Sequence, residues 1–180
     1  MPAKTILDTD NGELFNITLD PGYCFAMCVD MAKSLLNFQK IGRPKRFPGA
    51  DELNSGKWSI MQSAYEINSQ VNDRTLIEAQ GLEVRSTIAG TNFGGNFATV
   101  ANAITAIQGT TVFGIMGPGG GHELMWHRDD ANGVWLYLDP NEGLIRFDSV
   151  AEASAHIEND LSGSYDTLNE TYDAFTVELA

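Results

Sequence analysis

An apolar stripe with the spacing of an α-helix begins shortly after residue 21 of the chain. Its members recur at positions i, i+3, i+4, i+7 and i+11, and they are Cys24, Met27, Cys28, Met31 and Leu35. A proline such as Pro21 can open a helix, whereas Gly42 and Pro44 end one. The pattern therefore predicts a long helix from Pro21 to about Gln39, followed by a loop rich in proline, glycine and charge.

Other segments of the chain show either helical or strand periodicity. Further helices are predicted at 58–71, 97–107 and 150–161. Short runs rich in β-branched and aromatic residues, separated by turn-forming residues, predict strands at 111–116, 122–127, 134–138, 144–147 and 175–179. Segment 82–86 is predicted as a short strand or an extended loop. The order predicts an α+β fold, in which an N-terminal helical part packs its long helix on a C-terminal antiparallel sheet.

The turn near residue 130 predicts which side chains meet across one hairpin. If residues 129–132 form a four-residue loop, Arg128 pairs with Gly133. The same register places His122 opposite Asp139, with Cβ atoms about 5 Å apart. A carboxylate there can accept a hydrogen bond from one imidazole nitrogen and leave the other nitrogen for a second partner.

The composition predicts one folded domain over residues 1–180. The chain is 43% hydrophobic and 19% charged, which is typical of a globular protein and gives enough length for a single core. Its formal net charge is −13, which disfavours nucleic acid and anionic membrane surfaces as partners. The short basic cluster at 43–46 is interpreted as a solvated loop.

The N-terminal residues contain no apolar signal core, and no apolar run approaches the roughly 20 residues that cross a membrane. We therefore expect synthesis in the cytoplasm without a signal peptide and no membrane span. Secretion or delivery into a target cell would then use a route without a cleaved signal.

The two cysteines differ in their expected chemistry. Cys24 falls in the first turn of the predicted helix, where unpaired backbone N–H groups and the positive end of the helix dipole favour a thiolate. Cys28 lies one turn further along the same stripe, where a small buried hydrophobic side chain is the better interpretation. Two cysteines four residues apart do not indicate a disulfide framework.

Metal and phosphate sites fit the same residues less well. Cys24, Cys28, His122 and His127 could form a two-cysteine, two-histidine zinc site, but residues five apart on a strand point to opposite faces. Segment 122–127 has one residue too many for a zinc-protease helix motif. The glycine clusters at 94–95 and 119–121 lack the residues that follow them in a phosphate-binding loop. We therefore expect no metal and no cofactor.

Three segments together resemble the YopT-type peptidases, which are bacterial effectors related to papain. They are 22–31 (GYCFAMCVDM), 121–124 (GHEL) and 137–143 (YLDPNEG). The resemblance spans about residues 20–157, and its most specific part is the Asp-Pro-Asn-x-Gly turn. It implies a papain-like cysteine protease in which Cys24 attacks, His122 acts as general base and Asp139 orients the histidine. The family's oxyanion donor is an amide upstream of the cysteine, and the nearest here is Asn16, with the Cys24 backbone N–H as the alternative.

The resemblance leaves three functions open. The first is cleavage of an amide bond in a protein substrate by an effector or toxin, for which an immunity or inhibitor protein is a further possible partner. The second is deamidation or acyl transfer by the same three residues, because only the entering nucleophile differs. The third is a catalytically inactive papain-like binding module.

Overall fold

The computed structural model describes residues 3–9, 23–49, 55–67, 73–118 and 120–180. Asn16 and the Gly119 backbone lie outside these ranges. The helices are α1 (Cys24–Lys40), α2 (Ser55–Ile67), α3 (Asp73–Ala79), α4 (Phe97–Ala106) and α5 (Val150–Ser164). The strands are β1 (Lys4–Leu7), β2 (Leu82–Asn92), β3 (Gly109–Gly117), β4 (Gly120–Asp129), β5 (Val134–Asp139), β6 (Gly143–Phe147) and β7 (Thr171–Leu179).

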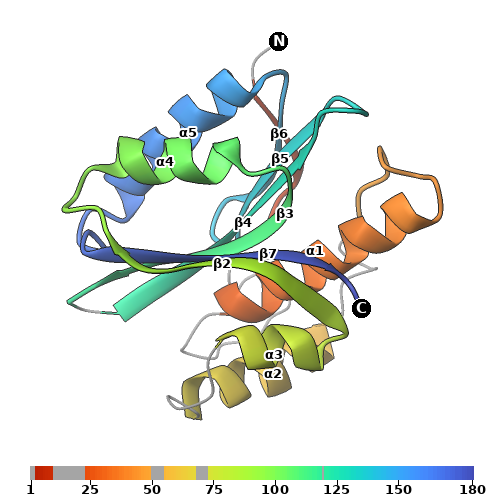
Figure 1. The fold of residues 1–180 in the computed structure, drawn as a ribbon, viewed down its shortest axis with the longest axis horizontal. Coiled ribbons are helices and arrows are strands. Elements are labelled where there is room, and N and C mark those ends of the chain that lie inside the picture. The colour runs from red at the N-terminus through yellow and green to blue at the C-terminus, as the bar shows by residue number, and fades with distance from the viewer. Residues whose placement is uncertain (1–2, 10–22, 50–54, 68–72, 119) are drawn as a thin grey trace.

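The strands of the described residues form one antiparallel sheet in the order β1-β6-β5-β4-β3-β7-β2. Strands β3 to β6 make the predicted meander, and β7 returns to lie between β3 and β2. Helices α1, α2 and α3 lie on one side of this sheet, and α4 and α5 lie together on the other (Figure 1). This arrangement confirms the predicted α+β class with the long helix packed on the sheet.

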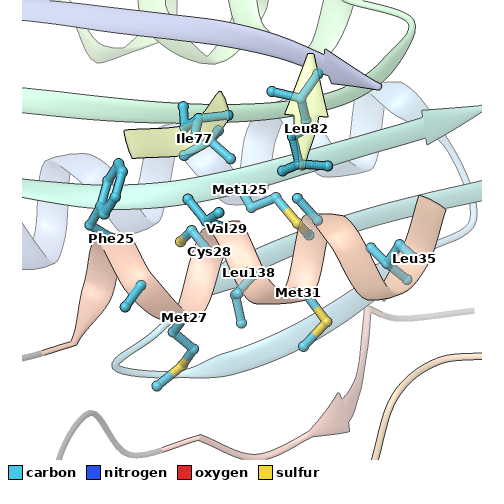
Figure 2. Packing of buried hydrophobic residues seen from close by; sticks show 14 of the residues in the cluster. Phe25, Met27, Cys28, Val29, Met31, Leu35, Ile77, Leu82, Met125 and Leu138 are labelled. Atoms are coloured by element: carbon cyan, nitrogen blue, oxygen red, sulfur yellow. The ribbon is translucent and has the colours of Figure 1, made fainter. Parts of the chain in front are cut away.

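Each face of the sheet carries its own core, because successive side chains of a strand point to opposite faces. On the α1 face, Figure 2 shows apolar side chains of α1 packed with Ile77, Leu82, Met125 and Leu138. On the other face, Leu124, Trp126 and Tyr137 pack in the core that includes residues of α4 and α5. Trp126 and Tyr137 are both fully buried in this core.

Several boundaries differ from the predicted ones. The helix predicted at 58–71 corresponds to α2, which ends at Ile67, and the sequence pattern does not predict α3. Strand β2 continues to Asn92, six residues beyond the predicted end, because pairing with β7 carries it through two irregularities and a glycine. The sequence pattern also missed β1, a four-residue edge strand paired with β6.

The predicted register of the β4–β5 hairpin is wrong by two residues. Arg128 pairs with Trp135 rather than Gly133, and Asp129 pairs with Val134. Gly133 has φ +63°, a conformation typical of a loop, and Asn132 donates two hydrogen bonds to the Asp129 side chain. The loop is therefore 130–133. Continued along the strands, this register puts Asp139 opposite Leu124, so Asp139 and His122 are diagonal neighbours on one face of the sheet.

Candidate active site

The thiol of Cys24 lies at the start of α1. Cys24 is the first residue of α1, whereas the sequence predicts it in the first turn of a helix that starts at Pro21. The carbonyl of Tyr23, the N-cap residue, accepts from the Met27 N–H at 2.9 Å. The side chain is half-buried and makes no disulfide. Its sulfur accepts hydrogen bonds from the backbone N–H groups of Phe25 and Glu123. The first turn contains no acidic residue that would oppose a negative sulfur.

His122 connects this thiol to a carboxylate. It is the third residue of β4, is 6% exposed and follows the glycines that open the strand. Its Nε2 atom lies 2.9 Å from Asp139 Oδ1. The ring also hydrogen-bonds to the Cys24 side chain, and Nδ1 is the nitrogen left for that contact. The structure therefore brings Cys24, His122 and Asp139 into one chain of side-chain contacts.

Asp139 is the last residue of β5 and is fully buried. Beyond His122, its carboxylate accepts from the Asn141 backbone N–H at 2.8 Å and from the Tyr165 hydroxyl at 2.6 Å. The Glu142 N–H donates to the Asp139 carbonyl at 3.0 Å, which closes the turn after β5. The Asp-Pro-Asn turn thus holds the carboxylate as well as ending the strand.

The three groups shift one another's acidity toward an ion pair. Burial alone would lower the pKa of His122, but its bonds to Asp139 and Cys24 and their charges outweigh this and raise the pKa to about 10. Burial likewise opposes ionisation of Cys24, yet His122 and the two backbone N–H groups lower the pKa of the thiol. The pKa of Asp139 is also lowered, because the bonds from His122, Tyr165 and Asn141 outweigh its burial. Both shifts favour an ion pair of a Cys24 thiolate and a His122 imidazolium.

Cys28 has the opposite environment. It is fully buried in the core on the α1 face, and its thiol donates to the Glu123 carbonyl at 3.4 Å. Burial, followed by the charges of Cys24, Glu123 and Asp139, raises its pKa well above the ordinary thiol value. Cys28 is therefore the buried core residue that the sequence predicts.

His127 lies away from these residues. It is buried at the other end of β4, where Nδ1 is 2.8 Å from Thr110 Oγ1 and Nε2 is 3.4 Å from the Gln39 amide nitrogen. Burial lowers its pKa to about 4. Within the described ranges, no group of three or more His, Cys, Asp or Glu side chains is arranged to hold a metal ion. No helix in the described part of the chain is long and apolar enough to cross a membrane.

Two residues near the site carry no sequence signal. Tyr165 stacks on the His122 ring with centroids 4.4 Å apart and planes at 17°. Asp160, on α5, is buried and accepts from the Tyr137 hydroxyl at 2.6 Å. Burial, with the charges of Asp139 and Glu142, raises the pKa of Asp160 to about 7 although the Tyr137 bond lowers it. Both residues sit on or after α5, more than 20 residues from Asp139, and no motif connects them to it.

Comparison with known proteins supports the fold that the motifs imply. The structure matches the crystal structure of the avirulence protein AvrPphB from Pseudomonas, with a TM-score of 0.62, 14% sequence identity and 97% of each chain covered. It also matches a cysteine protease-like domain of the Photorhabdus asymbiotica toxin PaTox, with a TM-score of 0.47, 15% identity, 96% of this chain and 53% of that chain covered. No family model matches the sequence, and no curated protein matches it either.

The likeness to AvrPphB extends over 97% of the chain at low sequence identity. Helix α1 with Cys24 at its start, followed by the antiparallel sheet, is thus a papain-like α+β fold. The class of fold predicted from the three motifs is confirmed, and the roles of Cys24, His122 and Asp139 stay predictions.

Proposed function

We propose that this protein is a cysteine protease that cleaves an amide bond in a protein substrate. The observation that carries the proposal is the continuous contact from the Cys24 thiol through His122 to the Asp139 carboxylate, 2.9 Å from Nε2. A nucleophile, a base in contact with it and a third group that orients the base are the parts that covalent hydrolysis needs.

The acyl-enzyme reaction assigns one task to each group. The Cys24 thiolate attacks the substrate carbonyl carbon and forms a carbon–sulfur bond. The His122 imidazolium gives its Nδ1 proton to the leaving amine as the carbon–nitrogen bond breaks. Neutral His122 then takes a proton from water, which attacks the thioester and releases the acid and the thiolate. Asp139 keeps the proton on Nε2, so that Nδ1 is the nitrogen that exchanges protons with substrate and water.

The negative oxygen that forms on the carbonyl needs donors near the sulfur. The Cys24 backbone N–H belongs to the first turn of α1, where backbone donors lack helical partners, and it is our proposed donor. Asn16, the side chain proposed for the same task, lies outside the described residues. The Asn16→Ala variant tests its share: a fall in kcat of about 10²-fold or more with little change in KM would assign it to the oxyanion site.

The experiment for the function compares two cysteine variants. Wild type, Cys24→Ala and Cys28→Ala are each mixed with a cell extract, and new protein N-termini are identified by mass spectrometry. We expect the same new N-termini with wild type and Cys28→Ala and none with Cys24→Ala. N-termini that persist with Cys24→Ala would remove Cys24 from the reaction, and Cys28→Ala controls for the loss of a thiol.

The same samples separate the two alternatives. Glutamine or asparagine side chains that gain the mass of deamidation, with no new N-termini, would replace cleavage by deamidation as the reaction. No change of any kind in the extract, together with slow alkylation of Cys24, would favour an inactive binding module. The shifted acidities of Cys24 and His122 support an active enzyme.

We further propose that the substrate is a protein of another cell, reached by the chain as an effector or toxin. The resemblance of its motifs to effector peptidases supports this, as does a fold shared with an avirulence protein. A protein that binds the site and blocks it is the corresponding immunity or inhibitor partner. Cleavage of a candidate substrate only in extracts of the target cell type would support the proposal.

A further inference from the structure

One side chain outside the proposed catalytic residues touches two of them. Tyr165 follows α5 and lays its ring on the face of His122, with centroids 4.4 Å apart. Its hydroxyl donates to Asp139 Oδ2 at 2.6 Å and accepts from the Asn141 side-chain amide at 2.7 Å. His122 thus has Asp139 at its Nε2 edge and Tyr165 against its face.

The backbone around Tyr165 is held firmly against the sheet. The Tyr165 N–H donates to the Leu161 carbonyl at 3.1 Å, and the Tyr165 carbonyl accepts from Leu168 at 2.9 Å. The loop then joins the end of β3, where the Glu170 N–H donates to the Met116 carbonyl at 3.0 Å. Gly117 allows this close approach, because a Cβ atom there would lie 2.2 Å from the Thr167 carbonyl oxygen. The ring is therefore placed by a loop fixed at both ends.

The hydroxyl of Tyr165 remains a donor at neutral pH. Burial, together with the Asp139 charge, raises the pKa of the phenol above its ordinary value. The Asp139 carboxylate therefore always meets a protonated partner. Oδ2 is occupied by Tyr165, while Oδ1 receives His122 and the Asn141 N–H, so the carboxylate has one preferred orientation.

We propose that Tyr165 is a positioning residue, which holds the His122 ring with Nε2 on Asp139 and Nδ1 toward Cys24 and shields the Nε2–H bond from water. Its effect on turnover rests on the proposed function. The orientation and shielding of the His122 ring can be measured without a substrate.

Two substitutions separate the hydroxyl from the ring. Tyr165→Phe removes the bond to Asp139 and keeps the stacked ring, whereas Tyr165→Leu removes both. Tyr172→Phe is the matched control, because Tyr172 is a buried tyrosine of the same core and its hydroxyl makes no described contact with His122. Nuclear magnetic resonance of ring-labelled histidine gives the exchange rate of the His122 Nε2–H with water for each variant.

We expect the Nε2–H of Tyr165→Leu to exchange at least about tenfold faster than in wild type. Its kcat should fall by about 10²-fold with KM nearly unchanged, because a displaced base lowers the rate without weakening substrate binding. Tyr165→Phe should lose about tenfold in kcat and keep most of the exchange protection. Tyr172→Phe should match wild type in both measurements.

Wild-type exchange and wild-type kcat in a folded Tyr165→Leu protein would overturn the proposal. If Tyr165→Leu does not fold, Tyr165→Phe decides: an unchanged kcat and an unchanged His122 signal would equally overturn it. The proposed function fails separately, when turnover survives in Cys24→Ala. In that case the exchange rates alone still decide whether Tyr165 positions His122.

Discussion

The two ends of strand β4 each carry a buried histidine, and the two behave in opposite ways. His122, 6% exposed, has a pKa raised to about 10, whereas His127, 1% exposed, has a pKa lowered to about 4. Burial lowers the pKa of both. The difference lies in the bonded partners: His122 bonds a carboxylate and a thiol, and His127 bonds a hydroxyl and an amide. The charge of Asp129 also raises the pKa of His127, but it does not outweigh burial. A carboxylate bonded directly to the ring, rather than depth, decides which buried histidine can carry a proton.

The comparison also separates the pH ranges in which each histidine affects folding. A raised pKa, as in His122, stabilises the fold fully below the unfolded pKa of about 6.5. That contribution is lost as the pH rises toward 10. A lowered pKa, as in His127, gives stability that is present above about 6.5 and is lost as the pH falls toward 4. The two ends of one strand should therefore limit stability on opposite sides of neutrality.

The largest expected effect comes from exchanging each histidine for glutamine. His122→Gln should lower kcat by about 10⁴ to 10⁶-fold, because glutamine cannot accept the proton of the thiol. His127→Gln keeps donors and acceptors for Thr110 and Gln39 and should stay within about tenfold of wild type. Turnover of the substrate identified with wild type is the measurement. Similar losses in both folded variants would contradict the division of the strand into a reactive and a structural end.

Asp139→Asn tests whether a charged partner is what distinguishes His122. Asparagine keeps the shape and suits a turn, but its amide group stabilises the wrong imidazole tautomer. We expect kcat to fall by about 10³ to 10⁴-fold while the melting temperature moves little. Near-normal turnover would show that Asp139 only closes the turn before β6, and Asn141 would become the next polar group to test.

The sequence predicts the contacts at the His122 end of β4 better than it predicts the residues that surround them. The stripe from Cys24 to Leu35 defines α1 and the thiol at its start, because helical periodicity is local. The contact of His122 with Asp139 is predicted even though the register is wrong, since the imidazole is long enough to reach a diagonal neighbour on the same face. The contact between the two side chains is therefore predicted correctly despite the two-residue error in the register.

The supporting residues could not be predicted for a physical reason. Tyr165 reaches Asp139 only because α5 crosses the sheet face and ends beside β5, a path that no local pattern records. The exposure of α3 residues and the polar, glycine-containing end of β2 likewise leave weak periodicity in the sequence. In both cases the element is stabilised by contacts with distant segments rather than by its own pattern.

The two cysteines of α1 should also differ in reactivity, by a smaller factor than the two histidines of β4. Iodoacetamide at pH 7 should modify Cys24 at least about 10²-fold faster than Cys28, because only Cys24 has partners for a thiolate. Peptide mapping after brief labelling measures both sites in one sample. His122→Gln is the control, since it should slow labelling of Cys24 and leave Cys28 unchanged. Equal rates in wild type would contradict the proposed nucleophile.

The smallest expected effect concerns Asp160, which lies near the reactive end and has no positive partner among the described residues. Within the part of the chain that the structure describes, its buried Oδ1 atom has no hydrogen-bond partner, and Oδ2 accepts from Tyr137. Burial and the neighbouring charges of Asp139 and Glu142 raise its pKa to about 7. When folding raises the pKa of an acid, the contribution of that acid to the free energy of unfolding is fully present below its unfolded pKa of about 3.9. It is lost as the pH rises to 7 and beyond.

Asp160→Asn removes this loss, because the amide stays neutral and can still accept from Tyr137. At pH 8 we expect the variant to melt about 3 °C or more above wild type, and at pH 5, where the wild type keeps most of this contribution, the difference should be smaller. His127 is present in both proteins, so its own acid-side contribution cancels in the comparison. Thermal melting of wild type and Asp160→Asn across pH 5 to 8 is the measurement, with Asp166→Asn as the exposed control. A melting-temperature difference that does not grow with pH would show that Asp160 stays ionised in the fold or has another hydrogen-bond partner. Of the two groups near the site, only His122 would then have a raised pKa.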